Sequence, residues 1–148
     1  MSASRTVQQI LNAKGSTVWT VAPEESVFEA LELMARHNVG ALVVATGAEP
    51  LGVLSERDYA RKIILVGKSS RETTVAEIMT SPVVTVEPKQ SVTDCMRIMT
   101  ERRVRHLPVL EGGQMIGIVS IGDVVKEIIT EQEHMIEQLQ GYISGTTY

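Results

Sequence analysis

A serine followed three residues later by an aspartate stands twice at the end of an apolar run, at Ser55–Asp58 and at Ser120–Asp123. In both copies a glycine, Gly52 or Gly117, precedes the serine by three residues. Such a run predicts a buried strand that leads into a helix, with the serine and the aspartate in the first helical turn. The free N–H groups of a helix start favour a phosphate, and a carboxylate accepts hydrogen bonds from the hydroxyls of a ribose. The two stretches are therefore candidate nucleotide sites.

The same spacing is also a capping box, in which the two side chains only start a helix. Residue types alone favour this structural interpretation, because six such pairs occur, at Thr6/Gln9, Ser26/Glu29, Ser55/Asp58, Thr74/Glu77, Ser91/Asp94 and Ser120/Asp123. Three observations favour a site at the third and the sixth pair. They follow a strand, at the edge where open α/β sheets bind ligands. A glycine allows close approach to the chain, and the polar groups match a ribose and a phosphate.

The chain contains a tandem repeat, in which residues 20–58 match residues 85–123 without a gap. Each copy predicts a short helix, a strand, a helix, two strands joined by a turn, and a final helix. In the first copy we expect these elements at residues 7–12, 18–21, 26–38, 41–45, 51–54 and 55–66. A half of about 60 residues buries too little surface to be robust alone. We therefore expect the two copies to pack together about an approximate two-fold axis.

Composition argues against several function classes. A net charge of −4 gives no reason to expect nucleic acid as a partner, and an aromatic content of 3% offers no platform for stacked bases. Cys95, the single cysteine, is predicted to be a buried structural thiol in a reducing compartment. Because no leader or membrane-spanning run is evident, we expect a cytoplasmic protein. The three histidines stand far apart and no nucleophile–base set is found, so neither a metal site nor an enzyme is expected.

The ordered motifs resemble the CBS-domain family, named after cystathionine β-synthase. The resemblance covers residues 7–128 and rests on Val75–Thr85 (VAEIMTSPVVT), Ser91–Met99, Val104–Val109 (VRHLPV) and the two glycine-started stretches. It implies an α/β fold (α+β type) of two pseudo-symmetric helix–strand–helix–strand–strand–helix repeats, packed together as a tandem CBS pair. The repeats are expected at residues 1–67 and 74–130, with a linker at 68–73 and a helical extension and tail at 131–148.

The resemblance also implies a function. Tandem CBS pairs bind adenosine nucleotides (AMP foremost, also ATP, ADP, NAD(H) or S-adenosylmethionine) between the repeats, act as regulators of a partner protein, and commonly form homodimers. Carried over by position, Asp58 and Asp123 would hold ribose hydroxyls, and Ser55 and Ser120 would meet phosphate. The residues implied around the base and the phosphate are Val18, Val83, Val104, Arg105, His106 and Ile118. The alternative is a structural dimerisation scaffold whose clefts bind nothing.

The two copies differ in charge near the candidate sites. Arg105 and His106 precede the second strand of the second copy, where the first copy has Gly40 and Ala41, and Arg57 stands beside the aspartate of the first copy. Because arginine and histidine suit a phosphate, we expect the serine and aspartate of the second copy, with Arg105 and His106 nearby, to form the better cleft. Structural or solvent-facing roles are assigned to the arginines that end the preceding helix, Arg102 and Arg103.

The last helix is expected to run well past the point where its counterpart stops. Its apolar positions form a heptad-like seam with one polar member, at Ile129, Gln132, Ile136, Leu139 and Ile143. Two interpretations stay open: the helix lies back on its own domain, or the seam receives a partner or a second copy. Residues 144–148 are expected to be frayed.

Overall fold

The structure is a computed structural model that describes residues 5–143, and of residues 142 and 143 the backbone alone. The helical elements are α1 (Val7–Lys14), α2 (Val27–His37), α3 (Glu56–Tyr59), the π-helical turn η1 (Ala60–Ile64), α4 (Val75–Ile78), α5 (Val92–Arg102) and α6 (Ile121–Ile143). The strands are β1 (Thr20–Val21), β2 (Ala41–Thr46), β3 (Glu49–Ser55), β4 (His106–Glu111) and β5 (Gln114–Ser120). The mixed helix and strand class is the one predicted.

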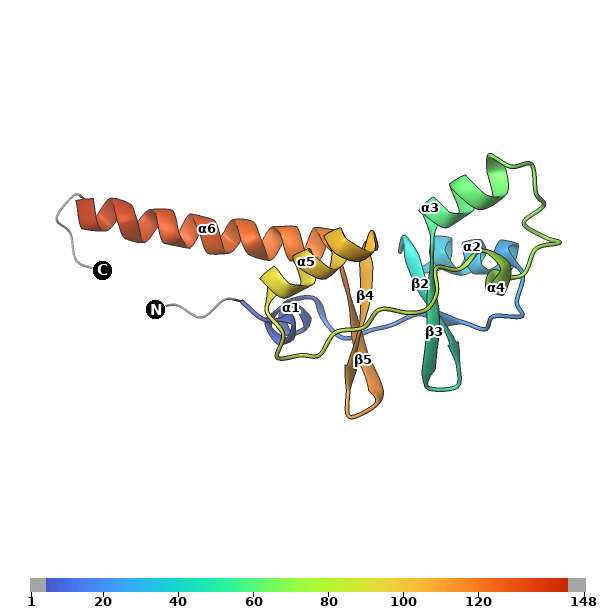
Figure 1. Cartoon of the computed structure of the whole chain (residues 1–148), viewed down its shortest axis with the longest axis horizontal. Coiled ribbons are helices and arrows are strands. Elements are labelled where there is room, and N and C mark those ends of the chain that lie inside the picture. Colours follow the sequence, from blue (N-terminus) through green and yellow to red (C-terminus); the bar gives the residue numbers. More distant parts are fainter. Residues whose placement is uncertain (1–4, 144–148) are drawn as a thin grey trace.

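Two halves lie side by side, each with its own small sheet and covering helices (Figure 1). In the first half the sheet order is β1-β2-β3, with β1 parallel to β2 and β3 antiparallel to it. In the second half β4 and β5 form an antiparallel hairpin. The two sheets approach each other through β3 and β5. The apolar residues form two separate cores, one in each half.

Each core is completed by the first helix of the other repeat. Helix α1 places Val7, Ile10 and Leu11 in the core of the second half. Helix α4 correspondingly places Val75 and Ile78 in the core of the first half. The exchange ties the two halves together, because neither core is complete without a helix from the other repeat.

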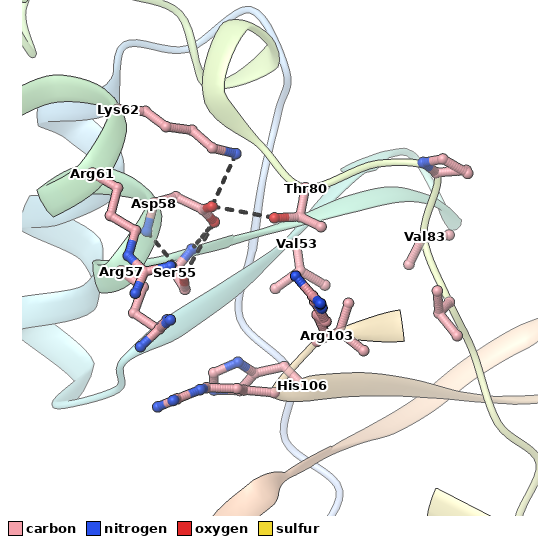
Figure 2. Close-up of a pocket in the computed structure, with 14 residues that line it drawn as sticks. Val53, Ser55, Arg57, Asp58, Arg61, Lys62, Thr80, Val83, Arg103 and His106 are labelled. Carbon is pink, nitrogen blue, oxygen red and sulfur yellow. Dashed lines mark hydrogen bonds and ion pairs between the residues drawn. The ribbon is translucent and has the colours of Figure 1, made fainter. Parts of the chain in front are cut away.

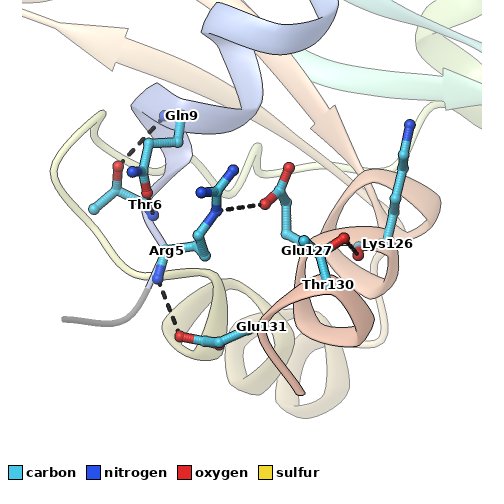
Figure 3. A network of polar contacts seen from close by, with 7 residues as sticks. All are labelled: Arg5, Thr6, Gln9, Lys126, Glu127, Thr130 and Glu131. Carbon is cyan, nitrogen blue, oxygen red and sulfur yellow. Dashed lines mark hydrogen bonds and ion pairs between the residues drawn. The ribbon is translucent and has the colours of Figure 1, made fainter. Parts of the chain in front are cut away.

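The N-terminal segment is also attached to α6 by polar contacts (Figure 3). Arg5 Nε lies 2.7 Å from Glu127 Oε2, and the Arg5 backbone N–H donates to Glu131 Oε1 at 3.3 Å. At the other end of α1, Lys14 Nζ lies 2.7 Å from Asp123 Oδ2 in the first turn of α6. Helix α1 is therefore held to α6 at both ends.

All six helix starts predicted from the capping pattern are confirmed. The side chains of Thr6, Ser26, Ser55 and Ser91 accept hydrogen bonds from the backbone N–H three residues later. Glu77 Oε2 accepts from the backbone N–H of Thr74 at 2.7 Å. The two boxes that follow a strand are reciprocal, since each serine N–H also donates to the aspartate three residues later.

The predicted symmetry fails at the first strand of the second copy. Thr20 and Val21 form a parallel ladder with β2, and Val43 N–H donates to the carbonyl of Trp19 at 3.1 Å. The counterpart of Val43 is Pro108, which has no N–H to donate. There the pairing is reduced to the isolated bridge between Val86 and Val109. A second difference is that the helix expected at residues 55–66 ends in the π-helical turn η1.

Helix α6 packs against α5 and α1 near its start and then extends beyond them (Figure 1). Ile129, Ile136 and Leu139 of the predicted seam are 49%, 53% and 58% exposed. The helix lies on its own half near its start, but the seam is not covered by it. Ile143 and residues 144–148 lie outside the described side chains. Within the described residues, no helix has the length and apolar character needed to cross a membrane.

Candidate functional site

A cavity of about 260 Å³ lies where the two halves meet. Three segments line it: the end of β3 with the helix after it, the chain that enters the second repeat, and the turn between α5 and β4. The lining residues are Val53, Ser55, Arg57, Asp58, Arg61, Lys62, Thr80, Pro82, Val83, Val84, Arg103, Val104, Arg105 and His106. Figure 2 shows Ser55, Asp58 and their helix on one side and His106 on the other, so both halves contribute.

Among the described residues that line the cavity, Asp58 is the only carboxylate, and four donors surround it. Its Oδ2 accepts from the backbone N–H of Ser55 at 2.9 Å and from the Ser55 hydroxyl at 3.1 Å. Its Oδ1 accepts from the hydroxyl of Thr80 at 3.2 Å and lies 3.1 Å from Lys62 Nζ. A carboxylate offers about four acceptor positions, so Asp58, which is 8% exposed, is fully used. A ligand hydroxyl can reach it only by replacing one of these donors.

Five cationic side chains line the cavity around this one carboxylate. Among the ion pairs of the described residues, only Lys62 of these five has a carboxylate partner. Arg57 loses hydration in the cavity, and the charges of Arg105 and Arg61 oppose its own, so the pKa of Arg57 lies below its ordinary value. Like charges are therefore held close together, and the charge of Asp58 only partly offsets them.

The apolar part of the lining comes from four valines and a proline. In Figure 2, Val83 lies on the side of the cavity opposite Arg57 and Arg61, with Val53 between. The cavity consequently has an apolar end at Val83 and a cationic end at Arg57 and Arg61, with Arg103 near Val53 in the middle of the view. Such a combination suits a flat apolar group that carries an anionic tail.

His106 is half-buried at the start of β4, and burial disfavours its charged form. The charge of Lys14 acts in the same direction, and together they outweigh the opposite effects of Asp123 and Asp58. The pKa of His106 is therefore below its ordinary value.

The lowered pKa of His106 predicts a pH dependence of stability. In the unfolded chain His106 takes up a proton as the pH falls below about 6.5, whereas the folded chain takes it up only at lower pH. The unfolded state then binds more protons, so the free energy of unfolding falls as the pH drops below about 6.5. We expect His106→Gln to lose less stability than wild type between pH 7.5 and pH 5.5 in urea unfolding. Equal losses would contradict the assignment, because the carboxylates titrate alike in both proteins.

The second serine–aspartate pair lies outside this cavity and holds a protein cation instead. Lys14 Nζ contacts Asp123 Oδ2 at 2.7 Å and donates to the carbonyl of Ile118 at 3.0 Å. Burial opposes the ionisation of Asp123, but hydrogen bonds from Lys14 and Ser120 outweigh it, so the pKa of Asp123 lies below its ordinary value. Asp123 is thus paired with Lys14, and its predicted role towards a ribose stays a prediction.

The structure groups the predicted site residues differently from the sequence. The residues that line the common cavity are Ser55, Arg57, Asp58, Val83, Val104, Arg105 and His106, and those outside it are Val18, Ile118, Ser120 and Asp123. Arg105 and His106 therefore line a cavity with the first serine–aspartate pair, and they also lie near the second pair, because the charge of Asp123 acts on His106. Although His106 pairs with Ser120 across the β4–β5 hairpin, its side chain lines a cavity that is built across the interface of the halves.

Four polar lining residues were not predicted: Arg61, Lys62, Thr80 and Arg103. Arg61 and Lys62 stand three and four residues after Asp58, which puts them on its face of a helix, so their spacing was an available signal. Arg103 was interpreted as a structural or solvent-facing charge. It lies in the left-handed region at φ 55°, like its counterpart Asn38 at φ 52°, and it lines the cavity (Figure 2).

Cys95 carries no reactive role in this arrangement. It is fully buried in the core of the second half. Burial, assisted by the charge of Asp94, raises its pKa to about 11. The prediction of a structural thiol is confirmed. Among the described residues there is also no group of three or more His, Cys, Asp or Glu side chains placed to hold a metal ion.

The CBS-domain family model matches the chain twice, at residues 15–65 and 75–130. The chain belongs to the CBS-domain family. As a CBS pair it is 41% identical to the mitochondrial CBS domain-containing protein CBSX3 of Arabidopsis thaliana, over 96% of this chain and 73% of the plant protein.

Solved structures support the assignment. One is a CBS-domain protein of Burkholderia ambifaria MC40-6, described as a candidate signal-transduction protein. It is 52% identical with a TM-score of 0.80, over 86% of this chain and 96% of that chain. The CBS domain pair of protein MJ0100, solved with 5′-methylthioadenosine and S-adenosyl-L-methionine, shares the fold at 22% identity. Its TM-score is 0.74, over 87% of this chain and 99% of that chain.

Proposed function

We propose that this CBS pair is a regulatory module that binds an adenosine nucleotide in the cavity between its halves. The observation that carries the proposal is the cavity itself, which joins an apolar end and a cationic end around Ser55 and Asp58. AMP, ADP, ATP and NAD(H) all offer the matching groups: a flat base, a ribose and phosphate. The presence of adenosine derivatives in the MJ0100 pair agrees with this ligand class.

In the proposed complex the base lies at the apolar end, between Val53 and Val83, and the phosphates lie at the arginines. The ribose hydroxyls replace Thr80 and Lys62 as donors to Asp58. Lys62 is suited to this exchange, because its side chain is 44% exposed and already donates to the carbonyl of Ile78 at 2.8 Å. Once released from Asp58, its ammonium group can turn towards a phosphate.

Transmission follows from a direct connection between the cavity and α6. The carbonyl of Arg105 accepts from the backbone N–H of Ile121, the first residue of α6, at 2.8 Å. A ligand that draws Arg105 and His106 towards the first half therefore also acts on the first turn of α6. It can shift this helix only as far as its affinities for the two arrangements differ.

A thermal-shift panel of AMP, ATP, NAD, NADH and S-adenosylmethionine on the full chain tests the proposal. A ligand at 100 times its Kd adds about 2.7 kcal/mol of stability, so binding raises the Tm clearly. Hydrogen exchange at residues 126–139 with and without the bound ligand then tests transmission, for which unchanged protection is the contrary result. If no ligand raises the Tm, the alternative of a structural scaffold with non-binding clefts is favoured.

The exposed seam of α6 supports a homodimer as a further part of the proposal. Ile129, Ile136 and Leu139 form an apolar stripe with heptad-like spacing. A seam of this kind is satisfied by an identical helix from a second copy. The dimer in turn provides the surface at which a regulated partner protein responds to ligand binding in the cavity.

Replacing Ile136 and Leu139 together by glutamine is expected to convert the dimer to a monomer, because a dimer seam depends on its apolar residues. Sedimentation equilibrium over a range of concentrations measures the change. The matched control replaces Glu133 and Glu137, on the same turns of α6, by glutamine and should leave the mass unchanged. A dimer that persists in the seam variant would place the interface elsewhere.

Two further predictions are retained within this proposal. A non-catalytic role is proposed because the one carboxylate among the described lining residues is already bonded to four donors. A cytoplasmic location remains a prediction from the sequence, and the plant relative CBSX3 is named as a mitochondrial protein.

A further inference from the structure

The lining of the cavity carries more positive charge than one phosphate can balance. Five of the 14 lysines and arginines of a chain with net charge −4 line this one cavity, against the single carboxylate of Asp58. Three of its arginines are exposed: Arg57 on α3, Arg61 on η1 and Arg105 on the turn before β4. The local charge at the cavity is therefore positive, whereas the net charge of the whole protein is negative.

From this geometry we infer that the cavity selects adenosine nucleotides with two or three phosphates over AMP. The inference rests on the proposed function and deepens it. A monophosphate carries a charge of about −1.5 to −2 at pH 7, which leaves a net positive edge. A triphosphate carries about twice as much and is long enough for its outer phosphates to meet separate guanidinium groups. The apolar end favours a nucleotide over inorganic polyphosphate, because it offers a surface for the base.

The same charge pattern indicates that the nucleotide binds without magnesium. Mg²⁺ in nucleotide sites is held by one or two carboxylates together with the phosphates. The one carboxylate here, Asp58, is bonded to Ser55, Thr80 and Lys62. A bound Mg²⁺ would also neutralise two of the negative charges with which the arginines are placed to interact. Excess Mg²⁺ is therefore expected to weaken the binding of ATP.

Calorimetry with AMP, ADP and ATP on the full chain, in about 0.1 M salt, tests the inference. We expect ATP to bind at least ~10-fold more tightly than AMP, with ADP between them, since one charge-assisted contact contributes about this factor. Millimolar Mg²⁺ should weaken the binding of ATP several-fold and leave the binding of AMP unchanged. AMP binding as tightly as ATP, or Mg²⁺ strengthening ATP, would overturn the inference and leave the proposed function standing. If none of the nucleotides binds, the proposed function fails as well.

Two variants locate the effect in the arginines. Arg61→Gln should weaken the binding of ATP about 5- to 10-fold and the binding of AMP by less than about twofold. Arg103→Asn should act in the same direction, and it should fold well because asparagine tolerates the left-handed conformation that its counterpart Asn38 already adopts. The matched control is Arg36→Gln, which removes the same charge from an exposed helical position outside the cavity. An equal loss in the control would show a bulk charge effect and overturn the inference.

Discussion

Replacing Gly52 by alanine is expected to lower the free energy of unfolding by about 3 kcal/mol, at the upper end of what overpacking costs. A Cβ at this position would lie 2.6 Å from the carbonyl oxygen of Thr80 and 3.1 Å from Met79 Sδ. The carbonyl cannot move away freely, because Val53 and Thr80 exchange two backbone hydrogen bonds, of 3.0 and 2.8 Å. The substitution must therefore break this bridge or displace β3.

The equivalent glycine of the second copy is the matched control. A Cβ on Gly117 would lie 2.6 Å from Leu11 Cδ2 and 3.0 Å from Leu11 Cδ1. A leucine side chain can change rotamer where a hydrogen-bonded carbonyl cannot, so Gly117→Ala is expected to cost only about 1 kcal/mol. Urea unfolding of both variants measures the difference. Equal costs would contradict the argument that a fixed backbone distinguishes the two sites.

Gly52→Ala should also affect the cavity, because Thr80 donates to Asp58 from the same bridge. A displaced Thr80 removes one donor and opens the contact between β3 and the chain that enters the second repeat. From the sequence, the two glycines were places where a ligand could approach the chain. The sequence did not show that the approaching groups are a backbone carbonyl in one copy and a leucine side chain in the other.

Local rules predicted most of the fold. Capping pairs mark helix starts because they satisfy N–H groups within four residues, and they need no knowledge of the rest of the chain. The repeat also predicted two similar halves, because two stretches with the same sequence pattern form the same elements. The exchange of α1 and α4 between the halves could not be predicted in this way, because it depends on which of two equivalent cores a short helix meets. The weak pairing of the first strand in the second copy could have been predicted from the sequence, since Pro108 lacks the N–H that Val43 donates.

The sequence predicted the parts of the site, but not that Arg105 and His106 also line a cavity with the first serine–aspartate pair. The serine–aspartate pairs and Arg105 with His106 were found from residue type and position. Their assignment to one cleft followed the order of the chain, whereas two halves related by a two-fold axis place the turn before β4 against the helix start of the other half. Lys14 was not foreseen as the partner of Asp123, because the two residues are distant in the sequence and meet only when α1 packs on the second half.

Replacing Asp58 by asparagine is expected to weaken the binding of ATP at least ~10-fold. Tripolyphosphate is expected to bind as tightly as before or more tightly. A hydrogen bond to a charged group contributes about 1.5–3 kcal/mol, and the ribose hydroxyls lose such a bond in this variant. The phosphates experience the opposite effect, because the substitution removes the only negative charge among five cations. One substitution thus separates the ribose end of the proposed site from its phosphate end.

Asparagine keeps the shape of Asp58 and an oxygen that can accept from the N–H of Ser55, so the start of α3 should be preserved; circular dichroism and the Tm check this. Asp123→Asn removes the same charge at the equivalent position outside the cavity and should change the affinity for ATP by less than about twofold. Calorimetry with both ligands on both variants gives the result. If ATP and tripolyphosphate weaken together in the Asp58 variant, Asp58 acts by shaping the cavity through Lys62 and Thr80, and the ribose does not bind it.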